Sequence, residues 1–147
     1  MSIADPADTA VSVYFEVHID GFELGAFTGC DGLGCEIVVE PREEGGQNSY
    51  IHQLPGRIKY TNVKLTRPVT IETTKIATWF AMMNGHVRRT RAEIIVKSHD
   101  HNPVFAWVLT DVIPVRWTGP SLSVESPKVA TETLELAHHG FLPDVVV

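Results

Sequence analysis

The chain has 147 residues, of which 44% are hydrophobic and 20% are charged, and its net charge at pH 7 is -6. This length and composition are those of one ordinary globular domain, so a disordered chain is excluded. The excess of acidic residues argues against a surface that grips nucleic acid, which needs clustered cations. No apolar run of about 18 residues occurs, which excludes a membrane-spanning helix.

The chain reads as a single domain over residues 1–147, without internal repeats. We expect residues 1–10 to form a flexible N-terminal arm and residues 142–147 a C-terminal tail. The opening MSIADPADTA carries acidic residues and lacks an apolar stretch, unlike a secretory signal. We therefore expect a protein that is made and kept in the cytosol until the cell lyses.

The first third of the chain predicts strands. In VYFEVHI (13–19) apolar and polar residues alternate, which indicates a half-buried strand. Asp20-Gly21 predicts a tight hairpin turn that leads into FELGAF (22–27). A loop of small residues (28–34) precedes CEIVVE (35–40), a predicted strand in which Ile37 and Val39 share one face.

The middle of the chain predicts a long hairpin. PREEGGQNS (41–49) is polar and rich in glycine, as expected of a hairpin tip or a mobile loop. Pro55-Gly56 predicts a second turn, between YIHQL (50–54) and IKYTNVKL (58–65). Both strand segments are polar on two faces, so they are poorly suited to lining the core of a monomer.

One helix is predicted after this hairpin, within TTKIATWFAMMNG (73–85). Thr73 or Thr74 can cap its start, and Ile76, Phe80 and Met83 fall on one face. The Asn-Gly pair at its end tolerates a left-handed backbone. We interpret the apolar face as core packing and not as a cofactor site.

The rest of the chain returns to strands: RAEIIVKS (91–98), a turn at 100–103 and a bent strand VFAWVLTDVIPVRW (104–117). Pro114 cannot donate a hydrogen bond, which favours an edge or a bulge. KVATETLELAHH (128–139) closes the set, with Glu132, Leu134 and Leu136 on one face. The predicted fold is mainly β (α+β): a sandwich or barrel of about seven strands, one α-helix and an extended hairpin loop.

Known catalytic motifs are missing: the sequence has no G-x-S-x-G, no H-E-x-x-H and no phosphate-binding glycine loop. A metal-dependent enzyme remains an alternative, with His99 and His101 in a turn and a third ligand from His18, His52, His138 or His139. Turn chemistry explains His99 and His101 more simply. His138 and His139 are adjacent in a strand and point to opposite faces, which indicates a strand end. We therefore predict no catalysis, no cofactor and no metal.

Two other clusters also favour structural interpretations. Cys30 and Cys35 lack the partners of a zinc site, so we expect reduced or buried thiols and no bridge on which the fold depends. Arg88, Arg89 and Arg91 form the one basic cluster, which we interpret as a solvated face or as parts of ion pairs.

Four stretches resemble one family. PVRWTGPSLSVESPKVATETLELAHHGF (114–141) resembles the ending of contractile tail-tube proteins, which form the inner tube of contractile phage tails and of extracellular contractile injection systems. YFEVHIDGFELGAFTGCDGLGCEIVVEPREEGG (14–46) resembles the family's opening, and LPGRIKYTNVKLTRPVT (54–70) resembles its P-G-x-x-K-Y-x-N-x-x-L-x-R segment. A helix containing Trp79 follows where the family's helix follows. The resemblance covers about Val11 to Leu142.

This resemblance implies a structural subunit that forms six-membered rings, stacked head-to-tail into a hollow tube, and a fold shared with the type six secretion tube protein. The implied partners are other copies of the chain, a surrounding sheath protein, baseplate or spike hub proteins, a terminal cap, and DNA or an effector protein as lumenal cargo. An acidic lumen would let acidic cargo slide. The implied location is a bacterial or archaeal cytoplasm during assembly, and afterwards a tail or injection particle that lysis releases.

We expect contacts between subunits at the long hairpin, because a monomer cannot cover its edges alone. The candidate contact residues are Arg42, Glu43, Glu44, Gly45, Gly46, Gln47, Asn48, Tyr50, Arg57, Lys59 and Tyr60. A further alternative is a monomeric binding module with Glu43–Ser49 as its contact loop.

Overall fold

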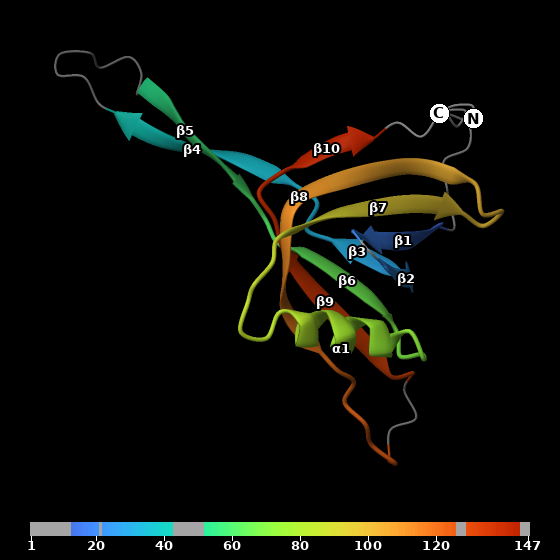
Figure 1. Ribbon diagram of the computed structural model, residues 1–147. Coiled ribbons are helices and arrows are strands. Elements are labelled where there is room, and N and C mark those ends of the chain that lie inside the picture. Colours follow the sequence, from blue (N-terminus) through green and yellow to red (C-terminus); the bar gives the residue numbers. More distant parts are fainter. Residues whose placement is uncertain (1–12, 21, 43–51, 126–128, 145–147) are drawn as a thin grey trace.

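The computed structural model describes residues 13–20, 22–42, 52–125 and 129–144, which form ten strands and one helix (Figure 1). The strands are β1 (Val13–Ile19), β2 (Phe22–Phe27), β3 (Gly29–Asp31), β4 (Cys35–Arg42), β5 (His52–Tyr60), β6 (Val63–Pro68), β7 (Thr90–Ser98), β8 (Pro103–Thr118), β9 (Thr131–Ala137) and β10 (Phe141–Asp144). Helix α1 spans Thr73–Met82. The predicted class, mainly β with one helix, is confirmed.

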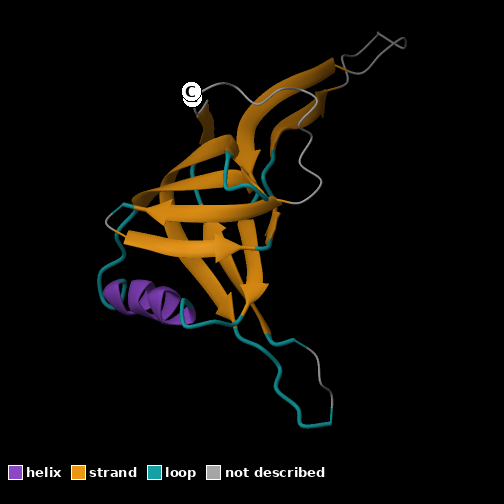
Figure 2. Ribbon diagram, turned by 90° about the vertical axis from the view of Figure 1, so that its right-hand side faces the viewer, coloured by secondary structure: helices purple, strands orange, loops and turns teal. Residues whose placement is uncertain are grey.

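Eight strands form one antiparallel sheet in the order β2-β1-β7-β8-β9-β6-β3, with β10 beside β8. The sheet curls on itself, so that β2 lies against β6 and β1 lies against β3 (Figures 1 and 2). Its main path has seven strands, as predicted. β4 and β5 pair with each other in a separate two-stranded sheet. Residues 142–144, expected within a C-terminal tail, belong to β10.

The core lies inside the curl of the sheet. It consists of inward-facing residues of six strands and of two residues of α1. These residues are Val17, Ile19, Leu24, Phe27, Val63, Leu65, Ile76, Trp79, Ala92, Ile94, Leu109, Val112, Leu134 and Leu136. The period-two pattern of β1 and β9 therefore predicted the buried face correctly. Pro114 marks a register shift between β8 and β9, which confirms the bulge expected there.

Helix α1 packs against β2 and β8 at one end of the sheet. Ile76 and Trp79 are buried, while Phe80 and Met83 pack against the core from its rim. The expected threonine cap is wrong. Glu72 is the N-cap and makes no side-chain cap bond. Thr73 is the first residue of the helix and donates its hydroxyl to Glu132. Gly85 adopts the expected left-handed backbone, with φ of 78°.

Two expectations around the hairpin are also wrong. Pro55-Gly56 makes no turn but lies inside β5. IKYTNVKL is not one strand, because residues 61–62 separate β5 from β6. In the described part of the chain, no helix has the length and apolarity needed to cross a membrane.

Candidate assembly surface

The β4–β5 hairpin projects from the barrel as an arm (Figures 1 and 2). Its apolar side chains are exposed: Ile37 and Ile58 at 54% each, and Val38, Val39 and Leu54 at 40–45%. Ile37 and Ile58 are register partners across the two strands. Apolar surface gathered on a projecting arm is typical of an interaction site. The hairpin thus offers apolar contacts to a partner, although its sequence predicted a polar one.

A bulge bends this arm. Ile37 pairs with Ile58 and Val39 pairs with Pro55, so Gly56 and Arg57 together oppose Val38. A Cβ at Gly56 would lie 2.6 Å from the carbonyl oxygen of Val38, which is closer than packed atoms allow. Proline fits beside it, since a bulge leaves backbone groups out of the ladder. The extra residue of the bulge lies on β5, so it leaves the alternation of β4 uninterrupted between Ile37 and Val39.

The base of the arm is fastened to the barrel at Tyr60. Its ring lies 5.6 Å from the ring of His138 and 5.7 Å from that of Phe141, measured between centroids. The Nε2 atom of His138 lies 3.0 Å from the carbonyl oxygen of Thr61. A Cβ at Gly140 would touch the Tyr60 ring at 3.4 Å, and its φ of +146° also suits glycine. These contacts join β5 to the segment between β9 and β10.

A second contact fastens the loop before β4. Thr61 donates its hydroxyl to the carbonyl oxygen of Gly32 at 2.6 Å. Gly32 has φ of +90°, and a Cβ there would lie only 2.1 Å from the carbonyl oxygen of Asn62. β4 therefore begins and β5 ends at a packed base, and this base fixes the direction of the arm relative to the barrel.

The predicted contact residues fall into three groups. Arg57 and Lys59 are exposed on β5, and the backbone of Arg42 ends β4. Tyr60 is half-buried at the base and packs within its own chain. The remaining candidates, Glu43, Glu44, Gly45, Gly46, Gln47, Asn48 and Tyr50, lie outside the described residues.

Sequence reasoning missed the apolar part of this surface. The signal was the run Ile37-Val38-Val39, which lacks the alternation of a strand with one buried face. Such a run predicts burial on both faces, and in this fold no described segment covers either face.

A second projection lies at the opposite end of the molecule, between β8 and β9 (Figures 1 and 2). Leu122 and Val124 are almost fully exposed in it, and Val129 is 75% exposed. Trp117 at its base is held by a hydrogen bond from its indole Nε1 to Glu132 Oε2, at 2.9 Å. The two apolar projections point away from each other.

The histidines of the metal alternative are not brought together. His99 and His101 are exposed in the β7–β8 turn, where His101 Nδ1 lies 2.7 Å from the hydroxyl of Tyr14. His138 is buried and His139 exposed, as expected for residues at the end of a strand. Among the described residues, neither His99 nor His101 belongs to a group of three possible metal ligands.

One such group does occur elsewhere, at Glu16, His18 and Glu23, whose ligand atoms lie within 4.8 Å of one another. The Nζ atom of Lys97 lies 2.6 Å from Glu16 Oε2, and His18 Nε2 lies 2.6 Å from Glu16 Oε1. The carboxylate of Glu16 is thus already neutralised by protein groups. The sequence signal for this cluster was the Asp20-Gly21 turn, because a hairpin at this turn places His18 opposite Glu23.

The pKa values in this cluster shift in opposite directions. Burial raises the pKa of Glu16, but the hydrogen bonds and charges of Lys97 and His18 outweigh burial, so the net shift is downward. The hydrogen bond with Glu16 raises the pKa of Lys97. Both shifts favour the charged pair.

The chain is similar to one protein family and to several solved structures. The family model of the T4-like virus tail tube protein gp19 matches residues 11–142. None of the curated protein sequences matches the chain.

Solved structures show the same fold. A chain in the baseplate of the anti-feeding prophage (AFP) superimposes with a TM-score of 0.77 at 22% identity, covering 96% of this chain and 97% of that one. A chain of the extended sheath–tube complex of PVC, an extracellular contractile injection system, gives 0.75 at 19% identity and coverages of 90% and 88%. Hcp1 from Salmonella typhimurium gives 0.56 at 14% identity and coverages of 90% and 93%. Since the family model spans nearly the whole described fold, the chain belongs to the T4-like virus tail tube protein gp19 family.

Proposed function

We propose that the chain is a structural, non-enzymatic subunit that forms six-membered rings, and that these rings stack into the inner tube of a contractile phage tail or contractile injection system. The β4–β5 arm carries this proposal. It is an apolar, two-stranded projection with a packed base, and its strands form a sheet separate from that of the other eight strands. The family match over residues 11–142 supplies the context.

The exposed apolar surface of the arm favours association between copies of the chain. Ile37 and Ile58 leave apolar surface in water, at a cost of about 25 cal/mol per Å² that a neighbour would remove. The outer edges of β4 and β5 have no strand partner among the described residues, and such edges accept added strands. We propose that the arm contacts a different surface on the neighbouring copy, so that the contact is head-to-tail. Repeated contacts of this type build rings and filaments.

The remaining partners follow from this role. The proposed neighbours are a sheath around the tube, a baseplate or spike hub at one end and a cap at the other. The structural neighbours in a sheath–tube complex, a baseplate and a tube-terminating cap support this choice. The proposed cargo is DNA or an effector protein, which a lumen with net negative charge would let slide. We infer assembly in the cytoplasm and release of the particle by lysis.

The mass of the purified protein over a range of concentrations tests this function. Light scattering after size exclusion should give a hexamer or larger multiples, and negative-stain images should show rings with a central hole. A chain that stays monomeric at the highest soluble concentration would refute the proposal.

A further inference from the structure

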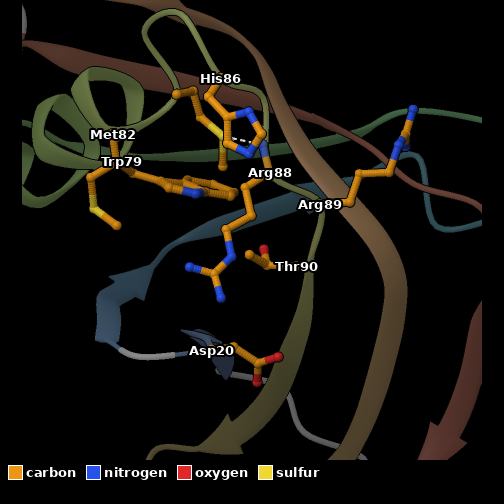
Figure 3. A pocket seen from close by; sticks show the side chains of 8 residues that line it. Asp20, Trp79, Met82, His86, Arg88, Arg89 and Thr90 are labelled. Atoms are coloured by element: carbon orange, nitrogen blue, oxygen red, sulfur yellow. Dashed lines mark hydrogen bonds between the residues drawn. The ribbon is translucent and has the colours of Figure 1, made fainter.

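A concavity of about 610 Å³ lies between α1 and the turn at Asp20 (Figure 3). One wall is apolar, formed by Trp79, Met82 and Met83. The other lining residues are polar and comprise two arginines, one acid, a histidine and a threonine: Arg88, Arg89, Asp20, His86 and Thr90. The tube role proposed above leaves this pocket unexplained.

The polar side of the pocket suits a carboxylate. The side chain of Arg88 is exposed and makes no ion pair with any described residue, and Figure 3 shows its guanidinium directed past Trp79 toward Thr90 and Asp20. A guanidinium binds a carboxylate through two parallel hydrogen bonds.

The loop that carries Arg88 is held in place. The backbone N–H of Arg88 donates to Met83 Sδ at 3.1 Å, and Nη1 of the neighbouring Arg89 donates to the carbonyl oxygen of Asp111 at 3.0 Å. The guanidinium of Arg88 therefore projects from a fixed segment. The thioether side chains beside it adapt to the shape of an apolar group. The pocket thus fits an acidic residue with an apolar neighbour.

The chain itself carries such a pair in Val124-Glu125, in a turn of the β8–β9 projection. Both side chains are exposed, and the backbone N–H of Glu125 donates to Ser123 Oγ within this turn. Glu36-Ile37, another exposed pair of this kind, lies in a strand, where neighbouring side chains point to opposite faces. A turn is free of that alternation.

We propose that Glu125 and Val124 of a second copy occupy this pocket, with the carboxylate on Arg88 and the apolar side chain against Trp79 and Met82. The inference rests on the proposed self-assembly and adds a second, charge-paired contact to that of the β4–β5 arm. It also gives a role to Arg88, one of the three arginines of the basic cluster in a chain of net charge -6. Opposite charges fix the register of such contacts.

Charge exchange tests the pair. Glu125→Arg and Arg88→Glu should each reduce the assembled fraction at least tenfold, measured by sedimentation and negative stain, while circular dichroism stays that of the wild type. The double variant should regain most of the assembly, because the pair is restored with its charges exchanged. Arg91→Glu is the matched control. Arg91 is exposed beside the pocket but does not line it, so Arg91→Glu should not rescue Glu125→Arg.

The outcomes separate the two proposals. If the wild type assembles and both single variants assemble equally well, or if the double variant regains nothing, the Arg88–Glu125 contact is wrong and the tube role stands. If the wild type stays monomeric, both the tube role and the Arg88–Glu125 contact are refuted. If the charge-exchange variants do not fold, cross-linking tests the contact instead. The variant for this test combines Val124→Cys with Met82→Cys in a Cys35→Ser background. Oxidation of the assembled protein should give ladders of cross-linked chains, and single chains alone would overturn the contact.

Discussion

Arg67 and Glu132 form an ion pair in the protein interior, where Arg67 Nε donates to Glu132 Oε1 at 2.7 Å and the two side chains are 3% and 0% exposed. Glu132 also accepts hydrogen bonds from Thr73 at the start of α1 and from Trp117 on β8. Arg67 donates to the carbonyl oxygen of Leu24 and stacks over the ring of Phe27, 4.2 Å from its centroid. The pair thus connects strands β2, β6, β8 and β9 with the helix.

Removing one partner should destabilise the fold strongly, because the other charge stays buried and unpaired. We expect Arg67→Ala to lower the free energy of unfolding by about 3–5 kcal/mol. Urea unfolding followed by circular dichroism measures the change. Lys64→Ala is the control: Lys64 is exposed on the same strand, so its loss should cost within about 0.5 kcal/mol. Equal effects of the two variants would contradict the structural role of the pair.

The two cysteines should differ in reactivity. Burial and the charge of Asp31 raise the pKa of Cys30 to about 11, whereas Cys35 is exposed. Thiolate is the reactive form, and at a pH of about 8 only about one Cys30 thiol in a thousand is ionised. An aromatic disulfide reagent should therefore show one fast and one slow thiol. Cys35→Ser should abolish the fast phase and Cys30→Ser should leave it. The double serine variant should still fold and assemble, since both thiols are free.

The Glu16–Lys97 pair predicts acid sensitivity. The pKa of Glu16 lies below its ordinary value of 4.5 in the folded state, so the unfolded chain takes up the proton first as the pH falls. Its contribution to stability is present above 4.5 and is lost as the pH falls through the folded pKa. Glu16→Gln should therefore be less stable than the wild type near neutral pH, and the gap should narrow at a pH of about 3. Urea unfolding at both pH values measures it. A gap that is constant with pH would show that the ion pair contributes nothing.

The sequence predicted those parts of the fold that depend on local pattern. Alternation in β1 and β9 identifies a buried face without knowledge of the rest. The 3.6-residue period of α1 placed Ile76 on the buried face but missed Trp79, which is also buried. Glu132 was placed on the same face of its strand as Leu134 and Leu136, but its burial was not predicted. Its partner Arg67 lies 65 residues away, and no local pattern joins two such positions.

Other parts depend on contacts that the sequence does not display. Pro-Gly is typical of turns, yet Pro55-Gly56 lies in a bulge because Val38 on the facing strand approaches Gly56. The threonines at the start of α1 are good cap residues, but Thr73 lies within the helix and donates its hydroxyl to the buried Glu132. The pocket beside Arg88 is formed by the helix end and the β1–β2 turn, which meet only in the folded chain.

The tip of the arm should act between subunits. Residues 43–49 are polar and contain two glycines, so ordering them is costly unless they gain contacts with a partner. Replacing Glu43–Ser49 by a short Gly-Ser turn should leave the circular dichroism and the melting temperature nearly unchanged, while rings no longer stack into tubes. Electron microscopy measures the tube length. Tubes of normal length from the shortened chain would show that the tip takes no part in assembly.

The bulge at Gly56 should control assembly independently of the stability of the barrel. In Gly56→Ala the new Cβ would lie 2.6 Å from the Val38 carbonyl oxygen, so the strands of the arm must separate or bend at this point. The arm is a separate two-stranded sheet, and the melting temperature of the barrel should therefore change little while tube formation falls sharply. Gly34→Ala is the matched control, because its Cβ would meet only Thr61 Oγ1, at an ordinary 3.9 Å. Sedimentation of assembled protein and thermal melting, measured on both variants, separate the two effects. If Gly56→Ala forms tubes as the control does, the shape of the arm does not matter to assembly, and its apolar surface must serve another partner.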